Sequence, residues 1–221
     1  MQRQLQLTAD GSHTISIPEL NVTYHSHHGA IQESRHVFIE AGLMSAMQIF
    51  GNDPIRILEI GFGTGLNALL TAVEAEQQQR NIQYITTEKY PLAAEETDAL
   101  NHGKLLYAEE LFRKLHAAAW GVSVEINKWY SIQKLHVALP ARLDITSVHC
   151  IFLDAFAPDV QPELWSTAFF EELFSKLHTG GNLVTYSSKV DVRRALKAAG
   201  FAVTKIPGPR GKREMVCAVK S

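Results

Sequence analysis

The chain has 221 residues, a formal net charge of −2 and 46% hydrophobic residues, which excludes a disordered or fibrous protein. Its length predicts one domain whose core is large enough to fold without disulfide bonds. No apolar run approaches the roughly 18 residues of a membrane-spanning helix, and the first twenty residues lack the apolar region of a secretory signal. Cys150 and Cys217 lie in apolar runs, so we expect buried, reduced thiols in a cytoplasmic protein.

The basic residues are unevenly distributed. Residues 189–221 contain nine lysines and arginines but only two acids, Asp191 and Glu214. A slightly negative total charge excludes a uniformly cationic surface, but it does not exclude a local patch that binds nucleic acid. The basic C-terminal segment is therefore either a solvated surface or such a patch, and composition leaves both readings open.

The first fifty residues are predicted to form an extension that packs on the rest of the domain. Polar and apolar residues alternate over 5–7, 14–17 and 22–24, which indicates a small β-hairpin. Apolar residues then recur at near-helical spacing over 31–50, and this predicts a helix.

Strands and helices alternate from residue 55 onward. We expect strands at 55–60, 82–87, 122–126, 149–153, 182–186, 201–206 and 214–219, and helices at 66–77, 91–100, 105–119, 163–177 and 190–199. This alternation is typical of a doubly wound, mostly parallel sheet with helices on both faces. The last two strands are joined by a loop, so they must be antiparallel neighbours. The prediction is a single α/β domain over 1–221 with a Rossmann-like, seven-stranded sheet that ends in an antiparallel hairpin.

The most specific motif is Glu59-Ile60-Gly61-Phe62-Gly63-Thr64-Gly65-Leu66-Asn67, between the first of these strands and the following helix. Glycines allow a tight turn and let a ligand approach the backbone, and open α/β sheets bind ligands at the carboxyl ends of strands. The third glycine comes too early for a dinucleotide fingerprint, and a P-loop lysine is absent. The pattern E-x-G-x-G-x-G instead resembles the first motif of class I S-adenosylmethionine (SAM) methyltransferases. A tight turn without a ligand is the alternative.

A carboxylate, Glu88, ends the second of the predicted parallel strands, 27 residues after Gly61. An acid at this place accepts hydrogen bonds from the ribose hydroxyls of a nucleotide cofactor, usually after about 20 residues. The intervening helix or its loop must therefore be extended. A surface ion pair with Lys89 is the alternative reading of Glu88.

Asp154 follows the predicted strand 149–153 and is placed beside the same crevice. An alkylammonium has no lone pair for methyl transfer until it loses a proton, and a partly buried aspartate can take that proton or orient the neutral amine. Phe156 offers a ring face to a cation or a base. The alternative is that Asp154 merely caps the next helix.

Taken in order, several motifs resemble the methyltransferase half of the bifunctional MnmC-type tRNA-modifying enzymes over nearly the whole chain. They are Tyr24-His25-Ser26 with Glu33-Ser34-Arg35, the glycine loop, Glu88-Lys89-Tyr90-Pro91-Leu92, Leu153 to Pro158 with Pro162 to Trp165, Val192-Arg193-Arg194, Ala199-Gly200-Phe201 and Gly211-Lys212-Arg213-Glu214-Met215.

The resemblance implies SAM-dependent methylation of the aminomethyl nitrogen of 5-aminomethyl-2-thiouridine at the tRNA wobble position, giving 5-methylaminomethyl-2-thiouridine. It implies that Asp154 is the catalytic acid or base and that Phe156 contacts the substrate. The implied cofactor site consists of Glu59, Gly61, Gly63, Gly65, Asn67, Glu88 and Glu33, of which Glu33 serves the cofactor or the substrate pocket. The implied contacts to tRNA phosphates are Arg193, Arg194, Arg210, Lys212 and Arg213.

The chain departs from this family in two ways. The bifunctional enzymes carry an FAD-dependent oxidase half, for which this chain has no room. We therefore expect a stand-alone methyltransferase, without an FAD domain or a membrane partner, that depends on upstream tRNA-modifying enzymes for its substrate. The third strand in such methyltransferases often ends in an acid that binds adenine, whereas here Asn127 is near that place.

We expect no metal site. The local cluster of His25, His27, His28 and His36 has imidazoles that can bind zinc or iron, but no cysteine or suitably spaced acid accompanies them.

Two other functions stay open. A SAM-dependent N-methyltransferase or an aminopropyl-transferring enzyme that acts on a small free amine would share the fold and the acid. A non-catalytic RNA-binding protein on the same scaffold would keep the basic segment, but the intact acid–glycine loop argues against it.

Overall fold

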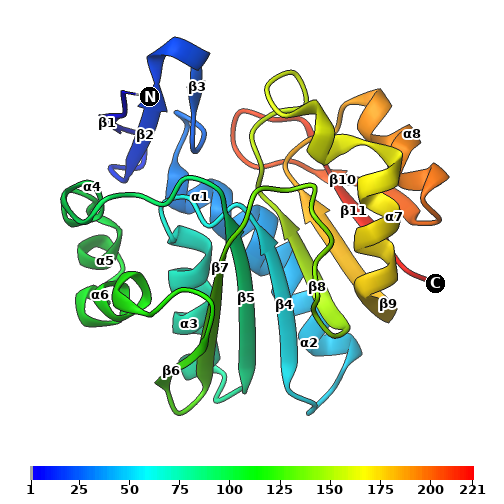
Figure 1. Ribbon diagram of the computed structural model, residues 1–221, viewed down its shortest axis with the longest axis horizontal. Coiled ribbons are helices and arrows are strands. Elements are labelled where there is room, and N and C mark those ends of the chain that lie inside the picture. The colour runs from blue at the N-terminus through cyan, green and yellow to red at the C-terminus, as the bar shows by residue number, and fades with distance from the viewer. Residues whose placement is uncertain (1) are drawn as a thin grey trace.

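The computed structural model describes residues 2–221, which form two β-sheets and the helices around them (Figure 1). The strands of the larger sheet are β4 (Ile55–Ile60), β5 (Ile82–Glu88), β6 (Ser123–Asn127), β7 (Tyr130–His136), β8 (Val148–Leu153), β9 (Leu177–Thr185), β10 (Ala202–Pro207) and β11 (Glu214–Val219). Their order is β10-β11-β9-β8-β4-β5-β7-β6. The mostly parallel sheet is confirmed, because β4, β5, β7, β8 and β9 run parallel. The predicted antiparallel hairpin is confirmed in β10 and β11.

The larger sheet has eight strands and not the predicted seven. The segment 122–126 was expected as the third parallel strand, but it belongs to β6, an antiparallel strand at the edge. The third parallel position, beside β5, is taken by β7. The strand β7 was not predicted because Lys134, a charged residue, lies on its buried face. This side chain is only 1% exposed. Its ammonium donates hydrogen bonds to the carbonyls of Leu115 and His116, at 2.9 and 2.7 Å, which compensates its burial.

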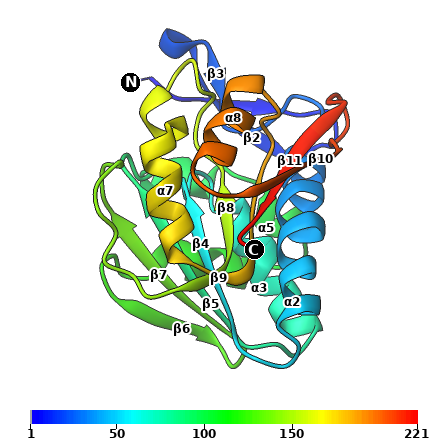
Figure 2. The ribbon, with the colours of Figure 1, turned by 90° about the vertical axis from the view of Figure 1, so that its right-hand side faces the viewer.

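Helices cover both faces of the larger sheet, as Figure 2 shows. One face carries α3 (Leu66–Gln77) and a continuous helical segment made of α1 (Ala30–Ser34), the π-helical η2 (Arg35–Met44) and α2 (Ser45–Ile49). The other face carries α7 (Thr167–Lys176) and α8 (Val190–Ala198). The shorter elements are η1 (Pro18–Leu20), α4 (Ala94–Asp98), α5 (His102–Leu105), α6 (Glu109–Ala117) and η3 (Pro162–Trp165). Among residues 2–221, no helix has the length and apolar character to cross a membrane.

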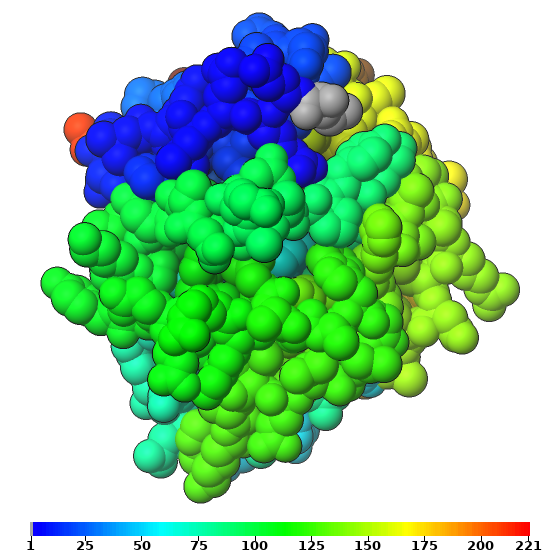
Figure 3. Space-filling model, turned by 60° about the vertical axis from the view of Figure 1, so that its left-hand side comes forward, coloured from blue at the N-terminus to red at the C-terminus, as the bar shows by residue number. Residues whose placement is uncertain are grey.

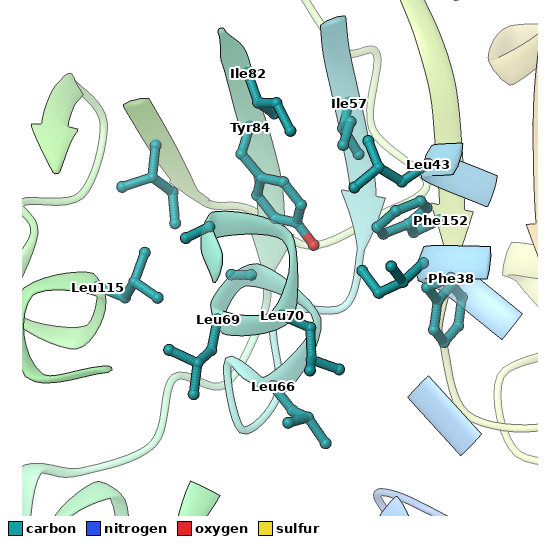
Figure 4. Close-up of a cluster of buried hydrophobic side chains, with 14 of the residues drawn as sticks. Phe38, Leu43, Ile57, Leu66, Leu69, Leu70, Ile82, Tyr84, Leu115 and Phe152 are labelled. Carbon is teal, nitrogen blue, oxygen red and sulfur yellow. The ribbon is translucent and has the colours of Figure 1, made fainter. Parts of the chain in front are cut away.

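The core under α3 fixes the position of the glycine loop. Leu66, Leu69 and Leu70 are spaced to share one face of α3, and each is at most 2% exposed. They belong to one buried cluster with Tyr84 of β5 and with Phe38 and Leu43 of η2, all labelled in Figure 4. Burying each such leucine contributes about 1.5–3 kcal/mol. The start of α3, and with it the loop that precedes this helix, is therefore fixed by packing against the sheet and η2.

The smaller sheet consists of β1 (Gln4–Leu7), β2 (His13–Ile17) and β3 (Val22–Thr23), in that order. It lies beyond the carboxyl ends of the central strands, and Figure 3 shows the N-terminal residues, in blue, resting on the green part of the chain. The Arg3 guanidinium donates to the carbonyl of Tyr90 at 2.6 Å and pairs with Glu96 at 2.8 Å. The backbone N–H of His13 donates to the side chain of Asn101 at 2.8 Å. These contacts attach the N-terminal sheet to the segment that follows β5.

His102 is a buried histidine without a hydrogen-bond partner on either ring nitrogen. Its ring lies 6.0 Å from those of His25 and Phe112. Burial, with smaller contributions from neighbouring histidines, lowers the pKa of His102 to about 3, so the folded protein holds it neutral.

Replacing His102 with leucine is expected to make stability less sensitive to acid. The unfolded state protonates His102 near pH 6.5 and the folded state near pH 3, so the wild type loses about 1.4 kcal/mol per pH unit from this group as the pH falls between these values. The variant lacks this loss and gains stability relative to the wild type below pH 6.5. Urea unfolding at pH 8, 6 and 5 measures the difference, and a difference that does not grow toward pH 5 contradicts the prediction.

Candidate active site

A cavity of about 650 Å³ lies at the carboxyl ends of β4, β5 and β8. Ile60, Thr87 and Asp154 line it from the ends of these strands, and Leu20 and Tyr24 line it from the N-terminal extension. Small-molecule sites typically enclose about 300–1,000 Å³ and combine apolar walls with a few polar groups. The cavity therefore has the size and the position of a ligand site in an open α/β sheet.

The glycine loop forms one wall of this cavity. Gly61, Gly63 and Gly65 have φ values of +99°, +52° and +72°, which side chains other than glycine rarely adopt. A Cβ atom on Gly61 would lie 2.8 Å from the carbonyl oxygen of Asp154, and one on Gly63 would lie 3.0 Å from the ring of Tyr24. Gly61 and Gly63 line the cavity, whereas Gly65 packs against His116 outside it. The predicted loop thus brings two of its three glycines to the cavity.

Glu88 lies at the end of β5 and holds the glycine loop. Its carboxylate accepts the backbone N–H of Gly63 at 3.0 Å and that of Tyr90 at 2.8 Å. Each carboxylate oxygen can accept two hydrogen bonds, so Glu88 still has acceptor capacity toward the cavity that it lines. Lys89, the alternative partner expected for it, lies over the ring of Tyr90, at 4.9 Å from its centroid.

Asn67 joins the buried acid Glu59, behind the loop, to the partly exposed acid Asp154 beside it. Its side-chain amide donates to Glu59 at 3.0 Å and to Asp154 at 2.8 Å, and Thr86 donates to the other oxygen of Glu59 at 2.6 Å. Glu59 is fully buried and does not line the cavity. The structure therefore does not bring it to the position from which the expected direct contact with the cofactor could be made. Burial raises the pKa of Glu59 to about 8, which favours a protonated, neutral side chain.

Asp154 is partly accessible and lines the cavity, as Glu33 and Glu88 also do. Burial, followed by the charge of Glu33, raises the pKa of Asp154 to about 7. The reading of Asp154 as a helix cap is wrong, because its carboxylate accepts from Asn67, η3 has no side-chain cap, and Ser166 caps α7 by accepting the N–H of Phe169 at 3.2 Å. A carboxyl that gains and loses a proton near neutral pH suits general acid–base catalysis.

Aromatic side chains stand around Asp154. Phe156 lines the cavity and meets Tyr24 edge to face, with ring centroids 5.2 Å apart. Tyr186 also lines the cavity, and its hydroxyl donates to the carbonyl of Ala155 at 2.9 Å. Such rings stabilise cations and keep water away from a reacting group.

Glu33 and Lys212 form an ion pair in the cavity wall. Glu33 in α1 is 7% exposed, and its carboxylate lies 2.8 Å from the ammonium of Lys212. The other oxygen of Glu33 accepts the N–H of Ser26 at 2.7 Å. The structure therefore places Lys212 inside the cavity and in contact with an acid, whereas the sequence grouped it with surface residues that meet phosphates.

The other predicted phosphate contacts lie outside the cavity. Arg194, Arg210 and Arg213 are exposed, and Arg194 lies 3.6 Å from Asp191. The guanidinium of Arg193 donates to the carbonyl of Ser188 at 3.2 Å. Their contact with RNA stays a prediction.

The sequence left the adenine contact open and offered only Asn127 near the expected strand end, but the structure places Asn127 away from the cavity. Asn127 pairs with Tyr130 at the start of β7, because β6 is antiparallel, and it therefore lies at the opposite end of the sheet from the cavity. The chain leaving β7 does reach the cavity, since Val137 lines it and donates its N–H to the carbonyl of Glu88 at 3.0 Å. The sequence also missed Tyr24 and Tyr186, although Tyr24 stands in a quoted motif and Tyr186 directly follows a buried strand.

The four histidines of the N-terminal cluster do not act together. His25, His27 and His28 line the cavity, with His25 itself buried, whereas His36 lies outside it and contacts the carbonyl of Pro207 at 2.9 Å. Within residues 2–221, no three histidine, cysteine or acidic side chains are grouped so that they could hold a metal ion. Both cysteines are free thiols.

Comparison with known proteins gives consistent results. A family model described as S-adenosyl-L-methionine-dependent methyltransferase matches residues 126–221. The tRNA 5-methylaminomethyl-2-thiouridine biosynthesis bifunctional protein MnmC of Aromatoleum aromaticum is 35% identical over 205 residues, which are 87% of this chain and 32% of that protein. The MnmC protein of Pseudomonas aeruginosa strain UCBPP-PA14 is 32% identical over 87% of this chain and 31% of its own length. The chain thus spans about a third of the length of these curated relatives.

Two solved structures share the fold. MnmC2 from Aquifex aeolicus superposes with a TM-score of 0.79 and 25% identity, over all of this chain and 71% of that one. Spermidine synthase from Thermotoga maritima has a TM-score of 0.58 at 14% identity, over all of this chain and 72% of that one, which is a likeness of fold alone.

Proposed function

We propose that this chain, which belongs to the S-adenosyl-L-methionine-dependent methyltransferases, methylates the aminomethyl nitrogen of 5-aminomethyl-2-thiouridine at the tRNA wobble position. The product would be 5-methylaminomethyl-2-thiouridine. The observation that carries the proposal is the position of Asp154, whose carboxyl lies beside the glycine loop in the cavity. Similarity to MnmC over 87% of the chain supports the choice of substrate.

The residues present fit SAM. The backbone of Gly61 and Gly63 reaches the cavity without a Cβ atom in the way, and Glu88 offers free acceptor positions for two ribose hydroxyls. We assign Gly61, Gly63 and Glu88 to the cofactor, with Val137 beside its adenosine end. When bound, SAM supplies an electrophilic methyl carbon on a sulfonium.

Asp154 would take a proton from the substrate's ammonium, which leaves the nitrogen with the lone pair that methylation needs. An ordinary aspartate and an alkylammonium differ by about 6.5 pKa units, so this proton transfer would cost about 9 kcal/mol. Because the pKa of Asp154 is raised to about 7, the cost falls to roughly 5 kcal/mol. The environment of Asp154 thus removes roughly half of the free-energy cost of moving the proton from the ammonium to the carboxylate.

The tRNA would be held outside the cavity by the basic C-terminal segment. Arg210 and Arg213 are exposed and flank Lys212, so phosphates bound to them would lie next to the cavity wall. A tRNA substrate would place the reaction in the cytoplasm, and other tRNA-modifying enzymes would have to supply the aminomethyl group.

The decisive experiment incubates the protein with SAM and a tRNA that carries 5-aminomethyl-2-thiouridine, then digests the tRNA and weighs the wobble nucleoside. A gain of one methyl mass on that nucleoside is expected. An unchanged nucleoside together with labelled methyl on free polyamines would favour the small-amine enzyme instead.

Replacing Glu88 with alanine is expected to weaken SAM binding by about 10–100-fold. The change removes charge-assisted hydrogen bonds worth about 1.5–3 kcal/mol, and it frees the N–H of Gly63. Calorimetric titration with SAM measures the Kd. Glu95→Ala, which removes an exposed acid from nearby α4, is the matched control, and equal affinities of the two variants would remove Glu88 from the cofactor site.

A further inference from the structure

Three charged side chains from distant parts of the sequence line the same cavity. Asp154 comes from the end of β8, Glu33 from α1 and Lys212 from the loop between β10 and β11. The ion pair of Glu33 and Lys212, at 2.8 Å, joins residues 179 positions apart. The Lys212 ammonium also lies 4.1 Å from the centroid of the Tyr186 ring, whose hydroxyl is bonded to the residue after Asp154. Both members of the pair therefore line the cavity that Asp154 lines, and Tyr186 connects Lys212 to the residue after Asp154.

The loop that carries Lys212 is held against the N-terminal extension at two further points. His36 contacts the carbonyl of Pro207 at 2.9 Å. Gly211 has a φ of +89° and packs so closely on His28 that a Cβ atom would overlap its ring. Lys212 is therefore directed inward by the backbone, while its neighbours Arg210 and Arg213 are exposed.

We propose that the ion pair of Glu33 and Lys212 sets the ionisation of Asp154, so that Lys212 is a positioning residue of the amine site and not a phosphate contact. The inference rests on the proposed function for the role of Asp154 as proton acceptor. The effect of the ion pair on the ionisation of Asp154 is a property of the protein without substrate or cofactor.

The charges around Asp154 give the pair opposing effects. Glu33 disfavours a negative charge on Asp154, and Lys212 favours it. Glu59 faces Asp154 from β4 through the shared Asn67 amide, and the phenols of Tyr84 and Tyr186 are neutral because burial raises the pKa of each. With the lysine removed, the unpaired Glu33 charge would keep Asp154 protonated to higher pH. With the glutamate removed, Lys212 would ionise Asp154 at lower pH.

The test follows the Asp154 carboxyl by ¹³C NMR in the protein without added ligands, with its signal identified by its loss in Asp154→Asn. Lys212→Met is expected to move the titration midpoint up by about 0.5–1 pH unit, and Glu33→Gln to move it down by a similar amount. The double variant should lie between them, and Lys212→Arg, which keeps the charge, should restore the wild-type midpoint.

The same hairpin offers a matched control. Lys205 in β10 pairs with Glu214 in β11 at 2.8 Å, the same distance, but on the exposed surface. Lys205→Met removes one positive charge without touching the cavity, so the Asp154 midpoint should stay at its wild-type value.

An unchanged midpoint in Lys212→Met, or shifts of the same sign in both single variants, overturns the inference. A raised KM for tRNA that depends on salt, with the midpoint unchanged, would assign Lys212 to phosphate after all. If Lys212→Met does not fold, the downward shift in Glu33→Gln decides. Because the NMR titration requires no methyl transfer, a negative tRNA assay with the expected shifts would refute the proposed function and leave the ion pair's effect standing.

Discussion

Asp154→Ala is expected to lower kcat for tRNA methylation by about 10²–10⁴-fold, the usual contribution of a general base, while the Kd for SAM stays within about twofold of the wild type. The proposal makes this carboxyl the proton acceptor, whereas the Glu88 carboxylate assigned to the cofactor is bonded to Gly63 and Tyr90 and not to Asp154. Single-turnover methylation and calorimetric titration with SAM measure the two quantities.

Asp154→Asn separates the loss of a proton acceptor from the loss of the side chain's size and contacts. The asparagine can keep the contact to Asn67 but cannot accept a proton, so it should be nearly as slow as the alanine variant. In the wild type, kcat/KM should fall about tenfold per pH unit below pH 7, because the raised pKa of about 7 leaves Asp154 protonated there. Full activity in either variant would remove Asp154 from the mechanism. Asp159→Asn, at an exposed acid on the following loop, is the control.

Gly61→Ala is expected to reduce the free energy of unfolding by about 2–5 kcal/mol and to weaken SAM binding as well. The φ of +99° is strained for alanine, at about 1–2 kcal/mol. The new methyl would also lie 2.8 Å from the backbone oxygen of Asp154 and would force the two strand ends apart, at a further 1–3 kcal/mol, roughly. Urea unfolding gives the first quantity, and calorimetry with SAM gives the second.

Gly121→Ala isolates the clash from the backbone strain. Gly121 has a similar φ of +82°, but no atom lies within 4 Å of the position that a Cβ atom would take there. We expect this variant to lose only about 1–2 kcal/mol and to bind SAM as the wild type does. Equal losses of unfolding free energy in the two variants would show that Gly61 is required only for its backbone conformation and not for the close approach of β4 to β8.

Local patterns were enough to predict the strand ends that make up the site. The glycine loop, Glu88 and Asp154 each directly follow a run of buried residues, and parallel strands bring such ends to one edge. The strand β7 was missed because Lys134 interrupts its apolar alternation, and the carbonyls that compensate this lysine belong to another element.

Contacts between distant segments could not be predicted in this way. Glu33 was recognised from its motif, but nothing in the sequence indicates that its partner lies in the final hairpin. The bridging role of Asn67 could not be predicted either. The sequence does not indicate that Glu59, two residues before Gly61, lies behind the cavity and is hydrogen-bonded to Asn67.

The pairing of Glu33 with Lys212 has a consequence for folding during synthesis of the protein. One side of the cavity comes from α1, near the beginning of the chain, and the facing lysine comes from the loop before the last strand. A polypeptide still being synthesised on the ribosome can assemble β4, α3 and β5 early, but its pocket stays open on one side until β11 has emerged. The cavity wall is therefore completed only after β11, which follows every other element of the two sheets in the sequence, has been synthesised.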